Sequence, residues 1–262
     1  MKMALVTPAP PRSRAGNRAT AARWSRLLRA AGYQVDILEQ WGADDRSYDL
    51  MIALHAWRSA SSIAAFSRRF PHRPLIVVLT GTDIYHFQHT HPEETRASLH
   101  SASALIGLHD HVTQDIPSTY HARLHIVHQS AQPLPASYPG PSVRRFTLCV
   151  VGHLREEKDS LRTAEAARLL PAESRIQIIH AGRSHTPDWA LAAQAQMRDN
   201  KRYSWLGEVS QTVIRRLYAR SQAMVISSLM EGGANVVSEA CVAGLPVIAS
   251  DIPGNTGLLG QD

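Results

Sequence analysis

Short runs rich in β-branched residues and leucine alternate with longer stretches of helical period along the whole chain. This alternation is typical of parallel sheets whose strands are joined by crossover helices, and no other feature constrains the fold as strongly. The chain has 262 residues, enough for two modest domains with a core each. We therefore expect an α/β protein made of two doubly wound, Rossmann-like domains.

The expected strands fall into two groups. The first consists of residues 2–7, 34–38, 50–54, 75–79, 104–107 and 124–127, and the second of residues 147–151, 175–180, 203–206, 223–226 and 246–249. Between the first two strands, the stretch from Asn17 to Ala31 repeats alanine and leucine on one face and arginine on the other. This pattern predicts an amphipathic helix that stops at Gly32.

A proline-rich stretch separates the two groups of strands. It contains Pro133, Pro135, Pro139 and Pro141 and has little periodicity, which indicates a linker. We predict an N-terminal domain over residues 1–140 and a C-terminal domain over residues 141–262. The carboxyl ends of the strands of two such domains would face a shared cleft, where folds of this class bind ligands. Because the sequence stops soon after the last expected strand, we expect the second domain to lack its last helices.

Several classes of protein are disfavoured by composition. Apolar runs such as residues 75–79 are too short to span a bilayer, and the N-terminus leads into prolines rather than into a signal peptide, so we expect a cytoplasmic protein. The two cysteines lie in apolar stretches and suggest no disulfide or metal framework. The 14 histidines invite a zinc interpretation, but no Cys or Glu-rich partner accompanies them, and we expect no metal.

The excess of positive over negative charge is confined to the first part of the chain. Residues 1–145 hold 16 basic and 10 acidic residues, whereas residues 146–262 hold 12 of each. The sequence has no zinc-finger spacing and no basic stripe with interleaved aromatic residues, so nucleic acid is not the expected partner. A small anionic ligand accounts for the excess more simply.

Residues 227–240 contain the strongest chemical motif. A strand leads into the turn at Gly232 and Gly233, and the turn opens a helix whose free amides and positive dipole end suit a phosphate. Glu231 lies at the tip of the strand. Glu239 lies about two helical turns further on, close enough to accept hydrogen bonds from sugar hydroxyls. The alternative is a helix with two solvent-exposed acids that begins at a flexible turn.

A second motif covers residues 150–158, where a strand is followed by Gly152 and then by Arg155 and Lys158 just before a helix. Cations in this position can neutralise a leaving diphosphate without a metal. The alternative is a solvated helix start, the usual place of such a charge run. Trp205 and Gly207 follow in a third segment, in which Trp205 is expected to be a packing residue and Ser210 a helix N-cap.

These motifs, in this order, resemble the retaining GT-B glycosyltransferases of family four. The resemblance implies that Glu239 holds the nucleotide ribose, that Glu231 contacts the transferred sugar, and that backbone amides of Asn235, Val236 and Val237 hold the diphosphate. The loop around Gly207 corresponds to the family's loop that reads the base. Lys158 matches the family's lysine, but His153 stands where the family usually has an arginine, so that Arg155 is a candidate substitute.

Two loops of the first half correspond to the family's acceptor side. The loop before the first helix carries the candidate residues Arg12, Arg14, Gly16, Asn17 and Arg18. A helix N-terminus and nearby guanidinium groups would favour an anionic acceptor, and a basic surface loop is the alternative. The loop with Thr82 and Asp83 matches the family's loop that touches the transferred sugar. Asp83 is either an acceptor for a sugar hydroxyl or a cap on the next turn.

The segments at residues 16–24, 79–83, 151–159, 205–208 and 231–236, with His153 among them, together resemble the selenosugar synthase branch of selenoneine biosynthesis. This resemblance implies an enzyme that joins a UDP-sugar, UDP-N-acetylglucosamine or a related hexose, to selenophosphate, with UDP and phosphate released and no cofactor. Membrane association is then not expected. Two alternatives stay open: a family-four enzyme that acts on a lipid or saccharide, whose basic half would face an anionic membrane, and a sugar-nucleotide-binding protein without catalysis.

Overall fold

The computed structural model describes residues 1–11, 13, 15–42 and 46–260. The predicted site residues Arg12 and Arg14 lie outside the described residues. The chain forms two units. The first comprises Met1–Gln129, Glu231–Asn235 and the segment from Thr256 onward, and the second comprises Ser130–Met230 and Val236–Asn255.

The first unit is built on a sheet of six parallel strands in the order β2-β1-β3-β4-β5-β6. The strands are β1 (Lys2–Val6), β2 (Gln34–Leu38), β3 (Leu50–Leu54), β4 (Leu75–Val78), β5 (Ala104–Gly107) and β6 (Leu124–Ile126). The helices are α1 (Gly16–Ala30), α2 (Ala60–Arg69), α3 (Gln88–Thr90) and α4 (Pro92–Ser101), with shorter helical segments η1 (Asp83–Phe87), η2 (Asp110–Gln114) and η3 (Ser118–Arg123).

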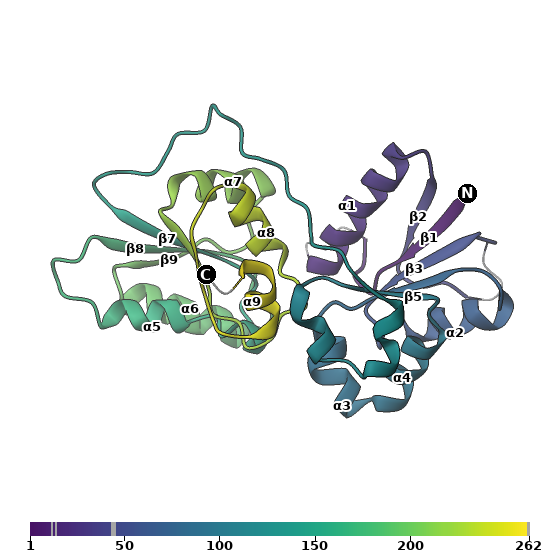
Figure 1. Ribbon diagram of the computed structural model, residues 1–262. Helices are drawn as coiled ribbons and strands as arrows, with labels where there is room; N and C mark the ends of the chain where they lie inside the picture. The colour runs from purple at the N-terminus through teal and green to yellow at the C-terminus, as the bar shows by residue number, and fades with distance from the viewer. Residues whose placement is uncertain (12, 14, 43–45, 261–262) are drawn as a thin grey trace. The chain divides into compact units, whose positions relative to one another are not determined.

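Both faces of this sheet are buried, because alternate residues of a strand point to opposite sides. In β1, Met3 and Leu5 belong to a core cluster against which Trp24 of α1 packs. Val6 instead belongs to the cluster that contains Phe66 of α2. Figure 1 shows α1 on one side of the sheet and α2 and α4 on the other. Burial on both faces is what the apolar strand sequences indicate for a parallel sheet.

The second unit has a sheet of five parallel strands in the order β11-β10-β7-β8-β9. The strands are β7 (Phe146–Val151), β8 (Ile176–Ala181), β9 (Tyr203–Trp205), β10 (Ala223–Ile226) and β11 (Val247–Ala249). The helical elements of this half of the chain are η4 (Glu156–Lys158), α5 (Arg162–Arg168), α6 (Pro187–Asp199), α7 (Gln211–Arg220), α8 (Asn235–Val242) and α9 (Pro253–Leu259). Its core includes Val150, Ile178 and Tyr203, with Trp205 packed against it.

The predicted α/β class is confirmed, and each expected strand is present with its ends within one residue of those predicted. The helix expected from Asn17 to Ala31 is α1, which starts and ends one residue earlier. Its end is marked by Gly32, which has the left-handed backbone, φ 89°, that glycine adopts most easily.

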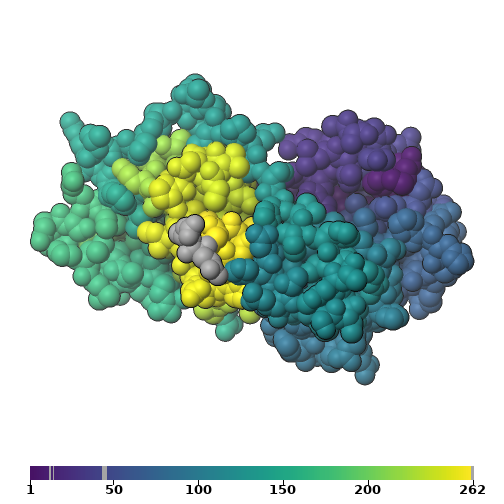
Figure 2. All heavy atoms as spheres, viewed as in Figure 1, coloured from purple at the N-terminus to yellow at the C-terminus, as the bar shows by residue number. Residues whose placement is uncertain are grey.

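The proline-rich segment after β6 contains neither helix nor strand over residues 127–145. From residue 131 onward it is half-exposed or exposed, and Figure 2 shows it in teal along the surface. The side chain of Gln222 donates to the backbone carbonyls of Ser142 and Arg145 at 2.7 and 2.9 Å and fixes the end of the segment before β7. Within the described part of the chain, no helix combines the length and hydropathy that a membrane span needs.

Candidate functional site

The loops at the carboxyl edge of the second sheet are joined to one another by backbone hydrogen bonds. The N–H of Leu154, after β7, donates to Arg183 after β8 at 2.9 Å. The N–H of Gly182 donates to Gly207 after β9, also at 2.9 Å, and the N–H of Leu229 after β10 donates to Glu157 at the same distance. The loops that follow β7, β8, β9 and β10 are therefore connected to one another, at the edge where parallel α/β sheets bind ligands.

The loop after β7 has its shape fixed by Ser160. Its hydroxyl accepts from the N–H of Arg155 at 3.0 Å and lies 3.1 Å from the carbonyl oxygen of the same residue. Asp159 closes the η4 turn with a left-handed backbone, φ 42°. The hydroxyl of Ser227, after β10, donates to the Asp159 carbonyl at 3.0 Å. The loop that carries the predicted cations is thus held from both sides.

Lys158 and Arg155 occupy different positions on this loop. The Cδ of Lys158 lies 4.0 Å from the point that a side chain at Gly152 would occupy, so the lysine passes close to the glycine. The Nε of Arg155 lies 3.7 Å from the Oε2 of Glu157, an ion pair with about a third of each side chain exposed. That Nε is buried and donates no hydrogen bond to any described residue. Arg155 therefore shares its charge with a carboxylate.

His153 is held as a neutral imidazole. Its Nδ1 accepts from the backbone N–H of Arg183 at 3.1 Å, so the proton is on Nε2. Burial, followed by the charges of Arg183, His185 and Arg155, lowers its pKa. A neutral ring cannot supply the positive charge that an arginine supplies at this position. Of the two residues, Arg155 is therefore the one that carries a cation on this loop.

A buried histidine that the sequence analysis missed lies beneath the same loop. His180 of β8 is 1% exposed, with its Nδ1 2.9 Å from the hydroxyl of Tyr203 and its Nε2 3.0 Å from the carbonyl oxygen of Gly152. Burial lowers the pKa of His180 to about 4. Within an otherwise apolar run, the residue looked like any other position of a core strand, and no sequence signal separated it.

Glu239 of α8 is held by the helix that precedes it. Its Oε2 accepts from the hydroxyl of Tyr218 at 3.1 Å, and its Oε1 accepts from the side chain of Gln211 at 3.3 Å. Burial and the neighbouring Glu239 raise the pKa of Tyr218, which keeps the phenol protonated as the donor. At the start of α7 the hydroxyl of Ser210 accepts from Val213 N–H, so the predicted N-cap is present.

The loop after β9 is set by a glycine and a tryptophan. Gly207 adopts φ 69°, a conformation that side chains disfavour. Trp205 is half-buried against the core, as expected of a packing residue, and its indole N–H donates to the Gly182 carbonyl at 2.7 Å.

In the first unit, the Gly-Gly turn lies directly against the backbone of the Thr82 loop. A Cβ on Gly232 would come within 2.2 Å of the Gly81 nitrogen, and one on Gly81 within 2.6 Å of the Gly232 nitrogen. Gly233 has φ 128° and abuts Leu108. Glu231 is only 9% exposed. The turn is therefore tightly packed, which contradicts the alternative of an exposed acid on a flexible turn.

Within the first unit, the side chain of Asn235 is hydrogen-bonded to side chains of α1. Arg23 donates to the Oδ1 of Asn235 at 2.7 Å, and the amide of Asn235 donates to Thr20 at 3.2 Å. The structure thus brings the predicted donor residue Asn235 next to α1. The predicted residues Gly16, Asn17 and Arg18 form the first turn of α1, which contains no acidic residue. Val236 and Val237 continue α8.

Asp83 is completely buried, and its carboxylate accepts from three backbone N–H groups at 2.7 to 3.0 Å, those of Gly81, Thr80 and Ala56. None of these N–H groups belongs to the turn that follows Asp83, so these contacts are not those of the predicted cap, and the sugar-binding role stays a prediction. Thr82 receives a hydrogen bond at 2.9 Å from the Nε2 of His55, whose Nδ1 accepts from Arg58 N–H. His55, with a left-handed backbone of φ 75°, was not predicted.

Two histidines of the segment after β4, His86 and His91, take part in an aromatic cluster. The rings of Trp57 and Phe87 stack at 3.9 Å, and His91 lies 4.5 Å from Trp57. Among the residues that the structure describes, no three His, Cys, Asp or Glu side chains are grouped as a metal would need.

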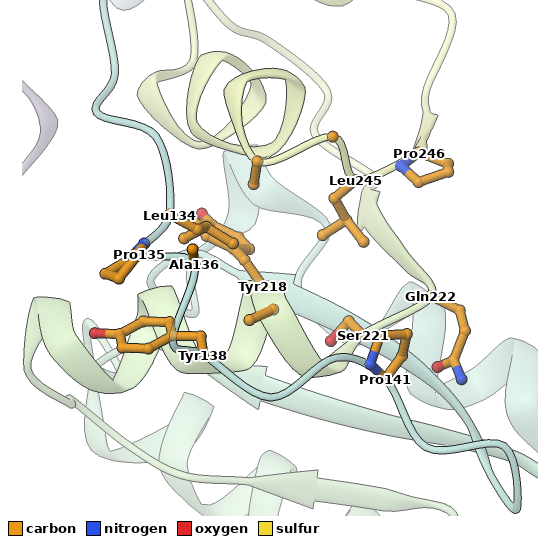
Figure 3. Close-up of a pocket in the computed structure, with 13 residues that line it drawn as sticks. Leu134, Pro135, Ala136, Tyr138, Pro141, Tyr218, Ser221, Gln222, Leu245 and Pro246 are labelled. Atoms are coloured by element: carbon orange, nitrogen blue, oxygen red, sulfur yellow. The ribbon is translucent and has the colours of Figure 1, made fainter.

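A cavity of about 520 Å³ lies elsewhere in the second unit. Figure 3 shows Leu134 and Pro135 of the linker on one side of this cavity and Leu245 and Pro246 on the other. The residues that line this cavity include Pro246, which immediately precedes β11. The cavity therefore lies at the amino edge of the sheet. The cavity is thus separate from the loops that carry Lys158 and Gly207, and we take those loops as the candidate site.

Comparison with known proteins gives a family match over part of the chain, and a fold. Residues 139–262 match the family described as "Glycosyl transferases group 1". No curated protein sequence matches the chain. Among solved structures, sucrose-phosphate synthase from Thermosynechococcus elongatus is similar with a TM-score of 0.79 at 15% identity, over 97% of this chain and 82% of that one. HepE from Anabaena in complex with UDP and glucose has a TM-score of 0.70 at 15% identity, with the same coverage.

Proposed function

The chain has the GT-B fold, and we propose that it is a UDP-sugar-dependent glycosyltransferase that acts as a selenosugar synthase in selenoneine biosynthesis. The observation that carries the transferase is the position of Lys158 beside Gly152, at the carboxyl edge of the sheet and within the residues that match group 1 glycosyl transferases. The complexes of HepE with UDP and with UDP-glucose support a uridine nucleotide as the donor. We propose that the enzyme works in the cytoplasm.

On the donor side, Lys158 and Arg155 stabilise the diphosphate that leaves with the electron pair of the broken bond. The amides at the start of α8, Asn235 to Val237, add their N–H groups and the positive end of the helix dipole. Glu239 accepts from the ribose hydroxyls, and Glu231 contacts the transferred sugar. No metal is required for this distribution of charge.

The proposed acceptor is selenophosphate. Its selenium attacks the anomeric carbon of UDP-N-acetylglucosamine or a related UDP-hexose, the carbon–oxygen bond to UDP breaks, and water then cleaves the selenium–phosphorus bond to release phosphate. Because the nucleophile is already strong, the site needs positive charge more than a general base. The excess of basic over acidic residues in residues 1–145 and the first turn of α1, free of acids, support an anionic acceptor.

Mass spectrometry of the products tests this proposal. The protein is incubated with UDP-N-acetylglucosamine and freshly prepared selenophosphate, with the acceptor omitted from a parallel reaction. We expect a hexosamine mass with the isotope pattern of selenium, and release of UDP that depends on selenophosphate. Binding of UDP-sugar without such a product, across a panel of UDP-hexoses, would refute the selenosugar assignment. Turnover with a saccharide or lipid would then identify a family-four transferase, and binding without any turnover a sugar-nucleotide-binding protein.

A further inference from the structure

A polar chain of two side chains crosses the core of the second unit and ends at the Gly152 loop. The carbonyl oxygen of Gly152 can only accept, so the Nε2 of His180, 3.0 Å away, must carry the proton. The Nδ1 then has a free electron pair and accepts from the hydroxyl of Tyr203 at 2.9 Å. His180 is thus a neutral ring with both nitrogens used, in a fixed tautomer and orientation.

An apolar residue at position 180 would pack in this strand without the cost of burying two polar nitrogens. His180 is 1% exposed, and its neighbours on β8 are isoleucine and alanine. The burial that lowers its pKa to about 4 keeps it uncharged at neutral pH. In return, the histidine makes one hydrogen bond to the carbonyl oxygen of Gly152, the first residue after β7.

The orientation of this carbonyl fixes the direction of the next N–H. A trans peptide is planar, and its C=O and N–H point in opposite directions. The Gly152 carbonyl oxygen lies 3.0 Å from the Nε2 of His180, so the N–H of His153 points away from His180. This N–H donates to no group among the described residues. It is therefore an available donor at the carboxyl edge of the sheet, beside the loop that carries Lys158.

Gly182 constrains the same peptide independently. A Cβ at this position would come within 1.7 Å of the Gly152 oxygen and 2.4 Å of its carbonyl carbon. Only a residue without a side chain leaves room for the peptide in its present orientation. His180 thus holds the Gly152–His153 peptide by a hydrogen bond, and Gly182 leaves room for it because it has no side chain.

We propose that His180 is a positioning residue that holds the Gly152–His153 peptide so that the N–H of His153 donates to a diphosphate oxygen of the bound nucleotide. The inference rests on the proposed function and adds to it a side chain in the core that acts through the backbone. A backbone N–H aimed at a phosphate before the ligand arrives costs no reorganisation on binding. With Lys158 close by, the two donors present a charged and a neutral hydrogen bond to the same anion.

Two substitutions at position 180 separate this role from simple core packing. Glutamine places its amide nitrogen near the Nε2 of histidine and keeps the donor to Gly152, whereas asparagine reaches only as far as Nδ1 and loses it. We expect His180→Asn to weaken UDP binding and to raise the KM for UDP-sugar about 10- to 100-fold, the range of one hydrogen bond to a charged group, with a smaller change in kcat. His180→Gln should bind UDP within about threefold of the wild type.

The experiment is titration calorimetry of the full chain with UDP, followed by steady-state kinetics. Asn200→Ala is the matched control, because the buried Asn200 also donates from its side chain to a backbone carbonyl, that of Ala164, but before β9 at the other edge of the sheet. Circular dichroism confirms that each variant is folded. If a folded His180→Asn binds UDP like the wild type, or if glutamine and asparagine are equivalent, the inference is wrong. Absence of UDP binding by the wild-type protein would refute the proposed function itself.

Discussion

The buried His180 makes acid stability the most direct test of the structure. An unfolded histidine takes up a proton near pH 6.5, but His180 in the folded chain does so only near pH 4, because burial disfavours its charged form. Between these values the unfolded state binds more protons than the folded state. The free energy of unfolding therefore rises with pH through this window and falls as the solution is acidified.

The magnitude follows from the two pKa values. Between pH 7 and pH 5, one such histidine removes about 2 kcal/mol from the free energy of unfolding. His180→Gln cannot titrate, so it lacks this contribution whatever its own packing costs at neutral pH. His109 of the first unit, with a pKa also lowered to about 4 by burial, titrates in both proteins and cancels from the comparison.

The assay is urea unfolding of the wild type and of His180→Gln at pH 7 and pH 5, followed by circular dichroism. We expect the wild type to lose about 2 kcal/mol more than the variant on going to pH 5. A difference between the two proteins that stays the same at both pH values would show that the pKa of His180 is not lowered by folding, and would refute the buried neutral ring.

Three further outcomes are expected. Lys158→Ala should reduce turnover by orders of magnitude in a folded protein, because the departing diphosphate loses its cation, whereas Lys201→Ala, in the turn before β9 at the other edge of the sheet, should have normal rates; equal rates for both variants would remove Lys158 from the site. Gly232→Ala should lower the free energy of unfolding by roughly 1–3 kcal/mol, and with it the melting temperature, because its Cβ would meet the Gly81 backbone. Gly140→Ala is the control: a Cβ there has no atom within 4 Å, so this variant should melt like the wild type. Treatment with EDTA should leave turnover unchanged, and restoration of lost activity by Mg²⁺ or Mn²⁺ would contradict a metal-independent reaction.

The strands were predictable because their signal is local. Each one is a short apolar run between turn residues, and in a parallel sheet with both faces buried this pattern alone identifies a strand. The loops were identified by glycines and cations that follow these runs. Their order along the sequence therefore predicts that Gly152, Lys158 and Gly207 lie at one edge of a sheet.

The contacts that give individual residues their roles were not predictable, because they join distant parts of the sequence. His180 meets Tyr203 and Gly152, which are 23 and 28 positions away, and nothing in its own segment indicates either partner. The carboxylate of Asp83 accepts from the N–H of Ala56, 27 positions away in the loop after β3, and nothing in the segment around Asp83 indicates this partner. The close approach of Gly81 and Gly232 is likewise a property of the fold.

The hydrogen bond from the indole of Trp205 to the Gly182 carbonyl gives the protein an internal optical reporter. Indole emission depends on the polarity and hydrogen bonding around the ring, and this ring is joined to the glycine that packs on the Gly152–His153 peptide. A charged nucleotide bound beside that peptide would change the polarity near the ring, and with it the emission of Trp205, without any label. The unmodified chain, compared with a Trp205→Phe variant, would then report the arrival of a ligand in real time.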